Sequence, residues 1–252
     1  MLVRNKKFNI LSKNLNQAYI EQPTTNNQQP TTSNQQPTAV IDIFFTSIKN
    51  PLKENLYEEY LYLLPKDLRE RNARFMRWKD RHAHLFGKLL LIEALKKYNI
   101  ENNIWDLIVY SKHKRPYFTL DEYDFNISHS GDYVLCAIGK NIKLGIDVEE
   151  NRERNFDDFQ NLMTTAQWEE IHSSKTPIKT FYKYWTIKES VIKADGRGFY
   201  IPLEELEVEN NTVQVDDKRW FINNFALAEG YSTALATNKE VSFKMHELDF
   251  YI

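Results

Sequence analysis

Two carboxylates stand two residues apart near the middle of the chain. The segment 145–149 reads GIDVE and has the composition of a β-strand. Side chains alternate along a strand, so Asp147 and Glu149 are expected on one face and Ile146 and Val148 on the other. Carboxylate oxygens suit Mg²⁺, which keeps several waters and shares phosphate oxygens. The pair is therefore either a site for a hard cation or the exposed end of a strand.

A second group of polar side chains follows helical spacing in the segment 185–193 (WTIKESVIK). Trp185, Glu189 and Lys193 are four residues apart and form one stripe of the expected helix. A separate apolar stripe contains Ile187, Val191 and Ala194. Glycines 196 and 198 end the helix beside the charged stripe. The alternative to a reactive site is an ordinary surface ion pair between Glu189 and Lys193.

Hydroxyl and imidazole side chains precede a glycine in the segment 125–131 (FNISHSG). Ser128 and His129 are expected in a turn that ends at Gly131, where backbone N–H groups can face an anion. A histidine in such a turn is more often structural. A catalytic Ser–His pair has no support, because no nucleophile elbow is present.

Basic residues form two clusters. Arg71, Arg74, Arg77 and Arg81 are spaced close to one face of a helix expected over 66–82, and the segment 112–115 reads KHKR. A solvated helix face is the usual meaning of such a run. Arginine also binds phosphate through its planar fork of donors. One anion with several phosphates could use both clusters and share a magnesium ion with the carboxylates.

The remaining pattern predicts a mixed α/β protein. Strands are expected at 39–46, 104–110, 133–138, 143–149, 205–215, 219–226, 231–237 and 241–248. Helices are expected at 53–64, 66–82, 80–97, 165–172 and 178–194.

The chain divides into an extension and two halves. Residues 1–38 form an N-terminal extension, in which 21–38 contain only Gln, Pro, Thr, Asn, Ser and Glu and are expected to be disordered. The segment FNISHSGDYVLCAIGKNIKLGIDVE is echoed by WFINNFALAEGYSTALATNKEVSFKMHE. The echo predicts two related α/β halves, at 39–144 and 145–252, unless it is a coincidence of strand–turn patterns.

Composition limits the class of protein. The 252 residues are 42% hydrophobic and 27% charged, with a net charge of −2 and one cysteine, Cys136. This excludes an internal disulfide framework and gives no general attraction for nucleic acid or membranes. Apolar runs are too short for a membrane span, and the N-terminus lacks the apolar segment of a secretory signal. We expect a cytoplasmic protein.

Three motifs in this order and spacing resemble those of one enzyme family. FNISHSGDYVLCAIG, LGIDVEE and FYKYWTIKESVIKADGRG look like the motifs of the 4′-phosphopantetheinyl transferases of the larger, surfactin-synthetase-activating type. The resemblance runs from about residue 64 to 202 and leaves the first 38 residues uncovered. It implies an α/β (α+β) pseudo-dimer of two similar halves, each a small antiparallel sheet with a long helix. The active site is expected between the halves of a monomer.

The resemblance also implies a reaction. Members of the family move the 4′-phosphopantetheine arm of coenzyme A to a serine of an apo acyl or peptidyl carrier protein, and they release 3′,5′-ADP. Mg²⁺, with Mn²⁺ as a substitute, is expected on Asp147, Glu149 and Glu189. Glu189 resembles the base that activates the serine, and Lys193 resembles the group that stabilises the leaving phosphate.

Further residues are implied in binding coenzyme A. They are Arg71, Arg74, Arg115, Ser128, His129, Lys188 and Lys193, with Ser128 and His129 at the 3′-phosphate. The chain departs from the Gly-Lys-Pro or Gly-Arg-Pro of the family at Lys114-Arg115-Pro116, so the backbone of this loop is expected to differ.

Two other functions are compatible with parts of this pattern. A magnesium-dependent nuclease would also use Asp147 and Glu149, but it needs a basic stripe long enough to follow a nucleic-acid backbone. A non-catalytic nucleotide-binding module would not need Lys193 beside Glu189.

Overall fold

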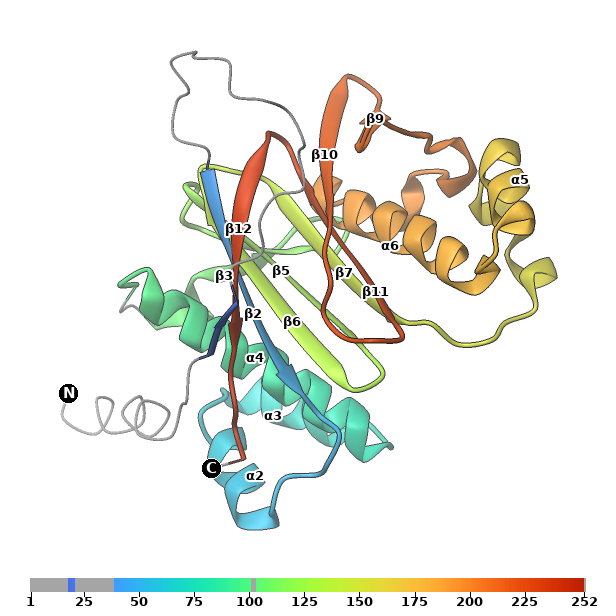
Figure 1. Ribbon diagram of the computed structural model, residues 1–252. Helices are drawn as coiled ribbons and strands as arrows, with labels where there is room; N and C mark the ends of the chain where they lie inside the picture. The colour runs from blue at the N-terminus through green and yellow to red at the C-terminus, as the bar shows by residue number, and fades with distance from the viewer. Residues whose placement is uncertain (1–17, 21–38, 101–102, 252) are drawn as a thin grey trace.

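The computed structural model describes residues 18–20, 39–100 and 103–251 (Figure 1). The expected disordered tract, 21–38, lies outside the described residues. Among these residues, no helix has both the length and the apolar character to cross a membrane.

Two five-stranded sheets form the centre of the molecule. The first has the spatial order β1 (Ala18–Ile20), β12 (Val241–Glu247), β2 (Ala39–Ser47), β6 (Tyr133–Lys140) and β5 (Tyr123–Ser130). The second has the order β7 (Leu144–Glu150), β11 (Tyr231–Thr237), β10 (Lys218–Asn224), β9 (Thr212–Val215) and β8 (Val208–Glu209). Neighbouring strands pair antiparallel, except that β12 runs parallel to β2.

Helices cover the outer faces of the two sheets. The first half contributes α2 (Glu54–Leu61), α3 (Lys66–Ala73), α4 (Trp78–Lys97), a 3₁₀ turn η2 (Ile104–Asp106) and the ribbon β3 (Ile108–Tyr110) and β4 (Pro116–Phe118). The second half contributes η3 (Phe156–Leu162), α5 (Thr165–Ser173), α6 (Pro177–Asp195), η4 (Gly198–Tyr200) and η5 (Leu203–Glu205).

Three buried clusters arrange these elements in four layers. The core under α4 joins its leucines to one face of the first sheet, at Phe44 and Cys136. The opposite face of that sheet packs on β7 and β11, as Ile41 and Ile146 illustrate. α6 covers the far side of the second sheet, where Val191 meets Ala234. The order is therefore α4, first sheet, second sheet, α6, with an extensive apolar interface between the sheets.

The internal echo corresponds to a repeated hairpin. β5–β6 in the first half and β10–β11 in the second are both antiparallel hairpins. The strand that follows each hairpin belongs to the opposite sheet, because β7 pairs with β11 and β12 pairs with β2. The expected mixed α/β architecture, in which each half has a small sheet and a long helix, is confirmed.

Four local expectations were wrong. The strand expected over 104–110 begins with the 3₁₀ turn η2, and only Ile108–Tyr110 is strand β3. The helix expected over 66–82 is broken, because α3 ends at Ala73 and α4 begins at Trp78. The segment expected to be a turn around Ser128 and His129 is strand β5. The strand expected over 205–215 is η5 followed by the β8–β9 hairpin, since Asn210 and Asn211 adopt positive φ angles at its turn.

Candidate active site

The edges of the two sheets meet along β5 and β7. These strands run side by side without a backbone ladder, and polar side chains of β5 take its place. The side chains involved alternate along the strand and all reach β7: Asp124, Asn126, Ser128 and Ser130. Asp124 accepts from Leu144 N at 3.0 Å, and Asn126 accepts from Ile146 N at 2.9 Å. We call this row of contacts the seam; it explains why the motif alternates polar and apolar residues.

Asp147 lies at the seam in a buried position. Its side chain is 3% exposed, and Oδ1 accepts from Lys193 Nζ at 2.5 Å and from Ser128 Oγ at 2.8 Å. Lys193 Nζ also lies 3.2 Å from Ser128 Oγ. Burial favours a neutral amine, but the carboxylates of Asp147 and Glu189 raise the pKa of Lys193, so it is an ammonium ion. The second oxygen, Asp147 Oδ2, is buried without a hydrogen-bond partner in the described structure.

Glu149 lies one step further along the same face of β7. Its Oε2 accepts from Ser130 Oγ at 2.7 Å, and its Oε1 accepts from Trp185 Nε1 at 3.2 Å. Trp185 is on α6, so Glu149 is held by side chains from both halves. Ile146 and Val148 point into the core between the sheets, as alternation along the strand requires.

Glu189 faces these groups from α6. Burial, helped by the charges of Asp147 and Glu149 and opposed by the charge of Lys193, raises the pKa of Glu189 to about 7. A carboxylate with such a pKa is half protonated near neutral pH and can accept or return a proton. The stripe Trp185, Glu189 and Lys193 thus faces the two carboxylates of β7.

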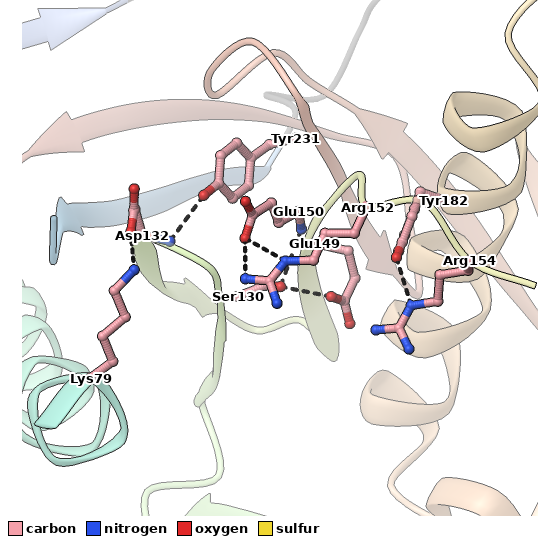
Figure 2. A network of polar contacts seen from close by, with 9 residues as sticks. All are labelled: Lys79, Ser130, Asp132, Glu149, Glu150, Arg152, Arg154, Tyr182 and Tyr231. Carbon is pink, nitrogen blue, oxygen red and sulfur yellow. Dashed lines mark hydrogen bonds and ion pairs between the residues drawn. The ribbon is translucent and has the colours of Figure 1, made fainter. Parts of the chain in front are cut away.

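A polar network surrounds the outer end of the seam (Figure 2). Arg152 donates to Glu150 through Nε at 2.9 Å, and Arg154 Nε donates to Tyr182 OH at 2.9 Å. Lys79 of α4 pairs with Asp132 in the β5–β6 turn at 2.5 Å. These contacts connect α4 to the β5–β6 turn and α6 to the segment that follows β7.

The turn between β5 and β6 requires glycine at position 131. Gly131 has a φ of +56°, and a Cβ there would collide with the Glu150 carboxylate and the Tyr231 hydroxyl. Tyr231 OH accepts from Asp132 N at 2.9 Å. The turn is therefore packed closely against β7 and β11 at the end of the seam.

A cavity of about 800 Å³ lies on the other side of β5. It is bounded by α3, α4, the β3–β4 ribbon and β5. Its basic lining consists of Arg71, His84, Lys88, Lys114 and His129. Apolar side chains such as Phe75 and Trp105 line it too, and so do the carboxylates Asp67, Asp80 and Asp106. His129 and Ser128 are successive residues of β5, so the cavity and the carboxylate cluster lie on opposite faces of one strand.

Burial modifies two groups on α4 that line this cavity. Burial, with the nearby charge of Arg71, lowers the pKa of Lys88 to about 8. Burial and the charges of Lys88 and Arg71 lower the pKa of His84 to about 4, so its ring is neutral at neutral pH.

The proton of the His84 ring can be placed from its neighbour Asn72. The Asn72 amide donates to Arg81 O at 2.8 Å and lies 3.1 Å from His84 Nδ1. Because this amide nitrogen is a donor, Nδ1 must accept and the proton is on Nε2. His84 Nε2 is buried and has no partner in the described part of the chain. It is therefore a free N–H donor beside the cavity.

The structure separates the residues implied in coenzyme A binding. Arg71 and His129 line the cavity, whereas Ser128 and Lys193 belong to the carboxylate cluster. Arg74 is exposed at the end of α3 and does not line the cavity.

Lys188 and Arg115, also implied in binding coenzyme A, make hydrogen bonds inside the protein. Lys188 is fully buried, and its Nζ donates to Leu203 O at 2.5 Å, away from the carboxylates. Arg115 turns inward toward Asp124 and α6. In this arrangement Lys188 Nζ and the Nε and Nη2 groups of Arg115 bind acceptors within the protein.

Sequence reasoning missed His84 and Lys88 as candidate site residues. A signal for them existed, because Asp80, His84 and Lys88 are spaced four residues apart on the clearest helix. That spacing marks one polar stripe on an otherwise buried element.

The loop that carries Lys114 keeps a tight turn. Lys114 has a φ of +65°, in the left-handed region that glycine favours. Ser111 Oγ accepts from His113 N at 3.2 Å and from Arg115 N at 3.1 Å and so closes this turn. Lys114 stands where the family often has glycine. It keeps a backbone conformation that glycine favours, and its side chain lines the cavity.

This arrangement defines a class of enzyme. A partly buried lysine, a carboxylate with a raised pKa and two further carboxylates suit the transfer of a phosphate-containing group, in which charge develops on phosphate oxygens. A basic cavity next to them suits a phosphorylated substrate.

Comparison with known proteins gives the family. Residues 50–141 match the model of the 4′-phosphopantetheinyl transferase N-terminal domain, and residues 143–236 match that of the 4′-phosphopantetheinyl transferase superfamily. The chain belongs to this superfamily. It is an enzyme that transfers the 4′-phosphopantetheine arm of coenzyme A to carrier proteins.

Individual relatives agree with this assignment. The chain is 29% identical to the 4′-phosphopantetheinyl transferase gsp of Aneurinibacillus migulanus over 69% of this chain and 74% of that protein. It is 24% identical to Sfp of Bacillus subtilis over 77% and 90% of the two chains. It is 28% identical to the human L-aminoadipate-semialdehyde dehydrogenase-phosphopantetheinyl transferase over 68% and 66%.

Proposed function

We propose that the carboxylate cluster performs the transfer to a serine of an apo carrier protein with release of 3′,5′-ADP. Glu189 takes the proton of the serine hydroxyl, and the resulting alkoxide forms the new bond to phosphorus while the bond to the ADP oxygen breaks. Lys193 neutralises the charge on the leaving phosphate. The observation that carries this proposal is the position of Lys193, with Nζ 2.5 Å from Asp147 and Glu189 one helical turn before it.

Magnesium is proposed as the resident cation, with manganese as a substitute. The described residues contain no group of three or more His, Cys, Asp or Glu side chains already arranged around a metal position. The carboxylate oxygens of the cluster nevertheless suit a hard cation. Asp147 Oδ2 is a buried carboxylate oxygen without a partner, and Glu149 and Glu189 lie on the same face. Mg²⁺ needs few protein ligands when substrate phosphates and water complete its octahedron.

When bound, Mg²⁺ would neutralise pyrophosphate charge. Asp147, Glu149 and Glu189 are the residues that we propose to hold it. Glu149 is oriented for this by Ser130 and Trp185. Proton transfer and stabilisation of the leaving phosphate are proposed for Glu189 and Lys193.

Coenzyme A is proposed to occupy the basic cavity. Arg71, Lys88 and Lys114 supply positive charge there, and His84 supplies a neutral N–H donor. His129 lines the cavity directly after Ser128 of the cluster and is proposed at the 3′-phosphate. The apolar part of the lining, at Phe75 and Trp105, suits the adenine ring.

The active unit is proposed to be a single chain in the cytoplasm that acts on no nucleic acid. The support for a monomer is that both sides of the site come from one chain, with β5 and β7 supplying its two walls. The location and the exclusion of nucleic acid and membrane partners remain predictions from composition.

The test is the mass of an apo acyl or peptidyl carrier protein after incubation with coenzyme A and Mg²⁺. We expect a gain of one phosphopantetheine arm with wild type and no gain in excess EDTA. Asp147→Asn should lower the rate by about a hundredfold or more, because it removes a carboxylate from the centre of charge development. Lys140→Gln, which removes an exposed ion pair with Glu122, is the matched control and should keep the wild-type rate.

The outcomes separate the parts of the proposal. Full activity in EDTA would contradict the metal assignment alone. Wild-type rate with Asp147→Asn would remove Asp147 from the site. No modification by the wild type of acyl and peptidyl carrier proteins alike would contradict the proposed acceptor.

A further inference from the structure

Arg115 makes four hydrogen bonds, two to Asp124 of its own half and two that reach β7 and α6 of the second sheet and its helix. Its Nη2 donates to both oxygens of Asp124, at 3.0 and 2.8 Å, and to Leu144 O at 3.0 Å. Its Nε donates to Lys193 O at 2.8 Å. The guanidinium thus contacts β5, β7 and α6 at once. Its side chain is 12% exposed and that of Asp124 is 1% exposed, so the pair is shielded from water.

The bond to Lys193 O is at the end of a helix. α6 ends at Asp195, and the carbonyl groups of its last turn have no partners within the helix. A cation at a helix C-terminus is also favoured by the helix dipole. Arg115 therefore caps α6 from the other half of the molecule.

The chain makes room for this contact. Gly196 follows α6 with a φ of +90°, and a Cβ at this position would lie 2.9 Å from Arg115 Cδ. Asp124 Oδ2 also accepts from Leu144 N at 3.0 Å, so the same carboxylate holds Arg115 and the start of β7.

We propose that Arg115 is a positioning residue for Lys193, and that the Arg115–Asp124 pair sets the distance between α6 and β7 at the active site. Arg115 binds the backbone of the very residue whose Nζ lies against Asp147. The inference rests on the proposed role of Lys193. It differs from the phosphate contact that the family resemblance implies for Arg115, because Nε and Nη2 of the guanidinium bind acceptors within the protein.

Neighbouring residues of one loop give a matched comparison. Lys114 lines the cavity, whereas Arg115 faces the seam. Arg115→Lys keeps the charge but cannot reproduce the planar fork. We expect it to lower kcat about tenfold or more and to leave the KM and the calorimetric Kd for coenzyme A within about threefold. Lys114→Ala should raise KM and Kd for coenzyme A and leave kcat within about twofold.

A second substitution protects the test against a folding defect. Asp124→Asn removes the charge that holds the guanidinium and should reproduce the loss in kcat with unchanged coenzyme A binding. If Arg115→Lys is unfolded at the assay temperature by thermal melting, the result for Asp124→Asn decides. A double-mutant cycle of Arg115→Lys and Asp124→Asn should be strongly non-additive in kcat, since either change releases the same contact.

The proposal is overturned if Arg115→Lys weakens coenzyme A binding tenfold with unchanged kcat, which is the behaviour of a phosphate ligand. It is also overturned if both folded variants keep the wild-type kcat. Inactive wild-type enzyme, by contrast, would contradict the proposed function and not this role.

Discussion

Lys188 and Lys193 are five residues apart on α6, and their side chains lie in different environments. Lys193 lies against Asp147, and the adjacent carboxylates keep it charged. Lys188 is fully buried on another side of the helix, and burial lowers its pKa to about 7 despite Glu204 nearby. The two lysines of one motif therefore have different tasks, because a helix turns them toward different neighbours.

Lys188→Met should leave the KM for coenzyme A within about twofold, since the amine contacts a backbone carbonyl and no cavity. The melting temperature is expected to fall by a few degrees, because Leu203 O loses its donor and an unsatisfied buried carbonyl costs about 1–3 kcal/mol. Steady-state kinetics and thermal melting check this. A tenfold higher KM at unchanged melting temperature would restore Lys188 as a phosphate ligand.

His84 should make stability fall in mild acid. Its folded pKa of about 4 is below the ordinary value of 6.5, so between these values the unfolded chain binds a proton that the folded chain does not. Stability is therefore unaffected by this group above about pH 6.5 and decreases as the pH falls from about 6.5 toward 4.

The corresponding measurement is the melting temperature at about pH 7.5 and about pH 5. From the higher to the lower pH, the melting temperature of the wild type should fall more than that of His84→Gln, which has no titrating ring. His172→Gln, at an exposed position on α5, is the control and should follow wild type. Equal losses for wild type and His84→Gln would show that the ring does not carry this effect.

At the scale of elements, α6 and β7 approach each other closely at Gly145. A Cβ on Gly145 would lie 2.5 Å from Ala194 N and closer still to Ser190 O. These are backbone atoms of a helix and cannot rotate away. The small residue thus lets α6 lie near enough for Glu189 and Lys193 to reach the face of Asp147.

Gly145→Ala is expected to displace α6 and to lower both stability and activity. The melting temperature should fall by about 2–4 °C or more, as expected for a loss of at least 1 kcal/mol in a protein of this size, and kcat should fall by about tenfold or more. Gly230→Ala is a control for glycine replacement, because its Cβ would meet nothing within 4 Å, although its own φ is +78°. Unchanged kcat in a folded Gly145→Ala enzyme would mean that the spacing of α6 and β7 does not limit the reaction.

At the scale of the whole molecule, each hairpin is followed by a strand that joins the other sheet. β7 follows β5–β6 and pairs with β11, whereas β12 follows β10–β11 and pairs with β2. The two halves therefore complete each other's sheets. We propose that the division near residue 144 marks two halves of the sequence but not two independent folding units, since β12 (Val241–Glu247) lies in the first sheet.

A chain that begins at Ala39 should keep its transfer rate within about twofold, since the carboxylate cluster and the cavity lie within residues 65–193. It lacks β1, which pairs with β12 at Ile20 and Met245, so the outer edge of β12 becomes free. Free edges favour association, so sedimentation should show more self-association than in the full chain. An inactive monomer with native melting would contradict the placement of the site in these residues.

Local pattern was sufficient for several parts of this protein. Alternation along 144–150 placed Asp147 and Glu149 on one face, and helical spacing placed Trp185, Glu189 and Lys193 on one stripe. Both periods are set by backbone geometry, which depends on neighbouring residues alone. The repeated strand–turn pattern likewise indicated two related halves. These features need no knowledge of distant contacts.

Only the tertiary structure decided which charged groups face a ligand and which face the protein. Arg115 resembles a phosphate ligand beside Lys114, yet its Nε and Nη2 bind Asp124, Leu144 and Lys193. His84 became a candidate because Asn72, on another helix, fixes its tautomer beside a cavity. Such outcomes depend on partners far apart in sequence and on burial, which sets the cost of leaving a polar group unpaired. The local sequence therefore determines where the motifs lie on strands and helices. Tertiary packing determines which of their side chains can contact a ligand.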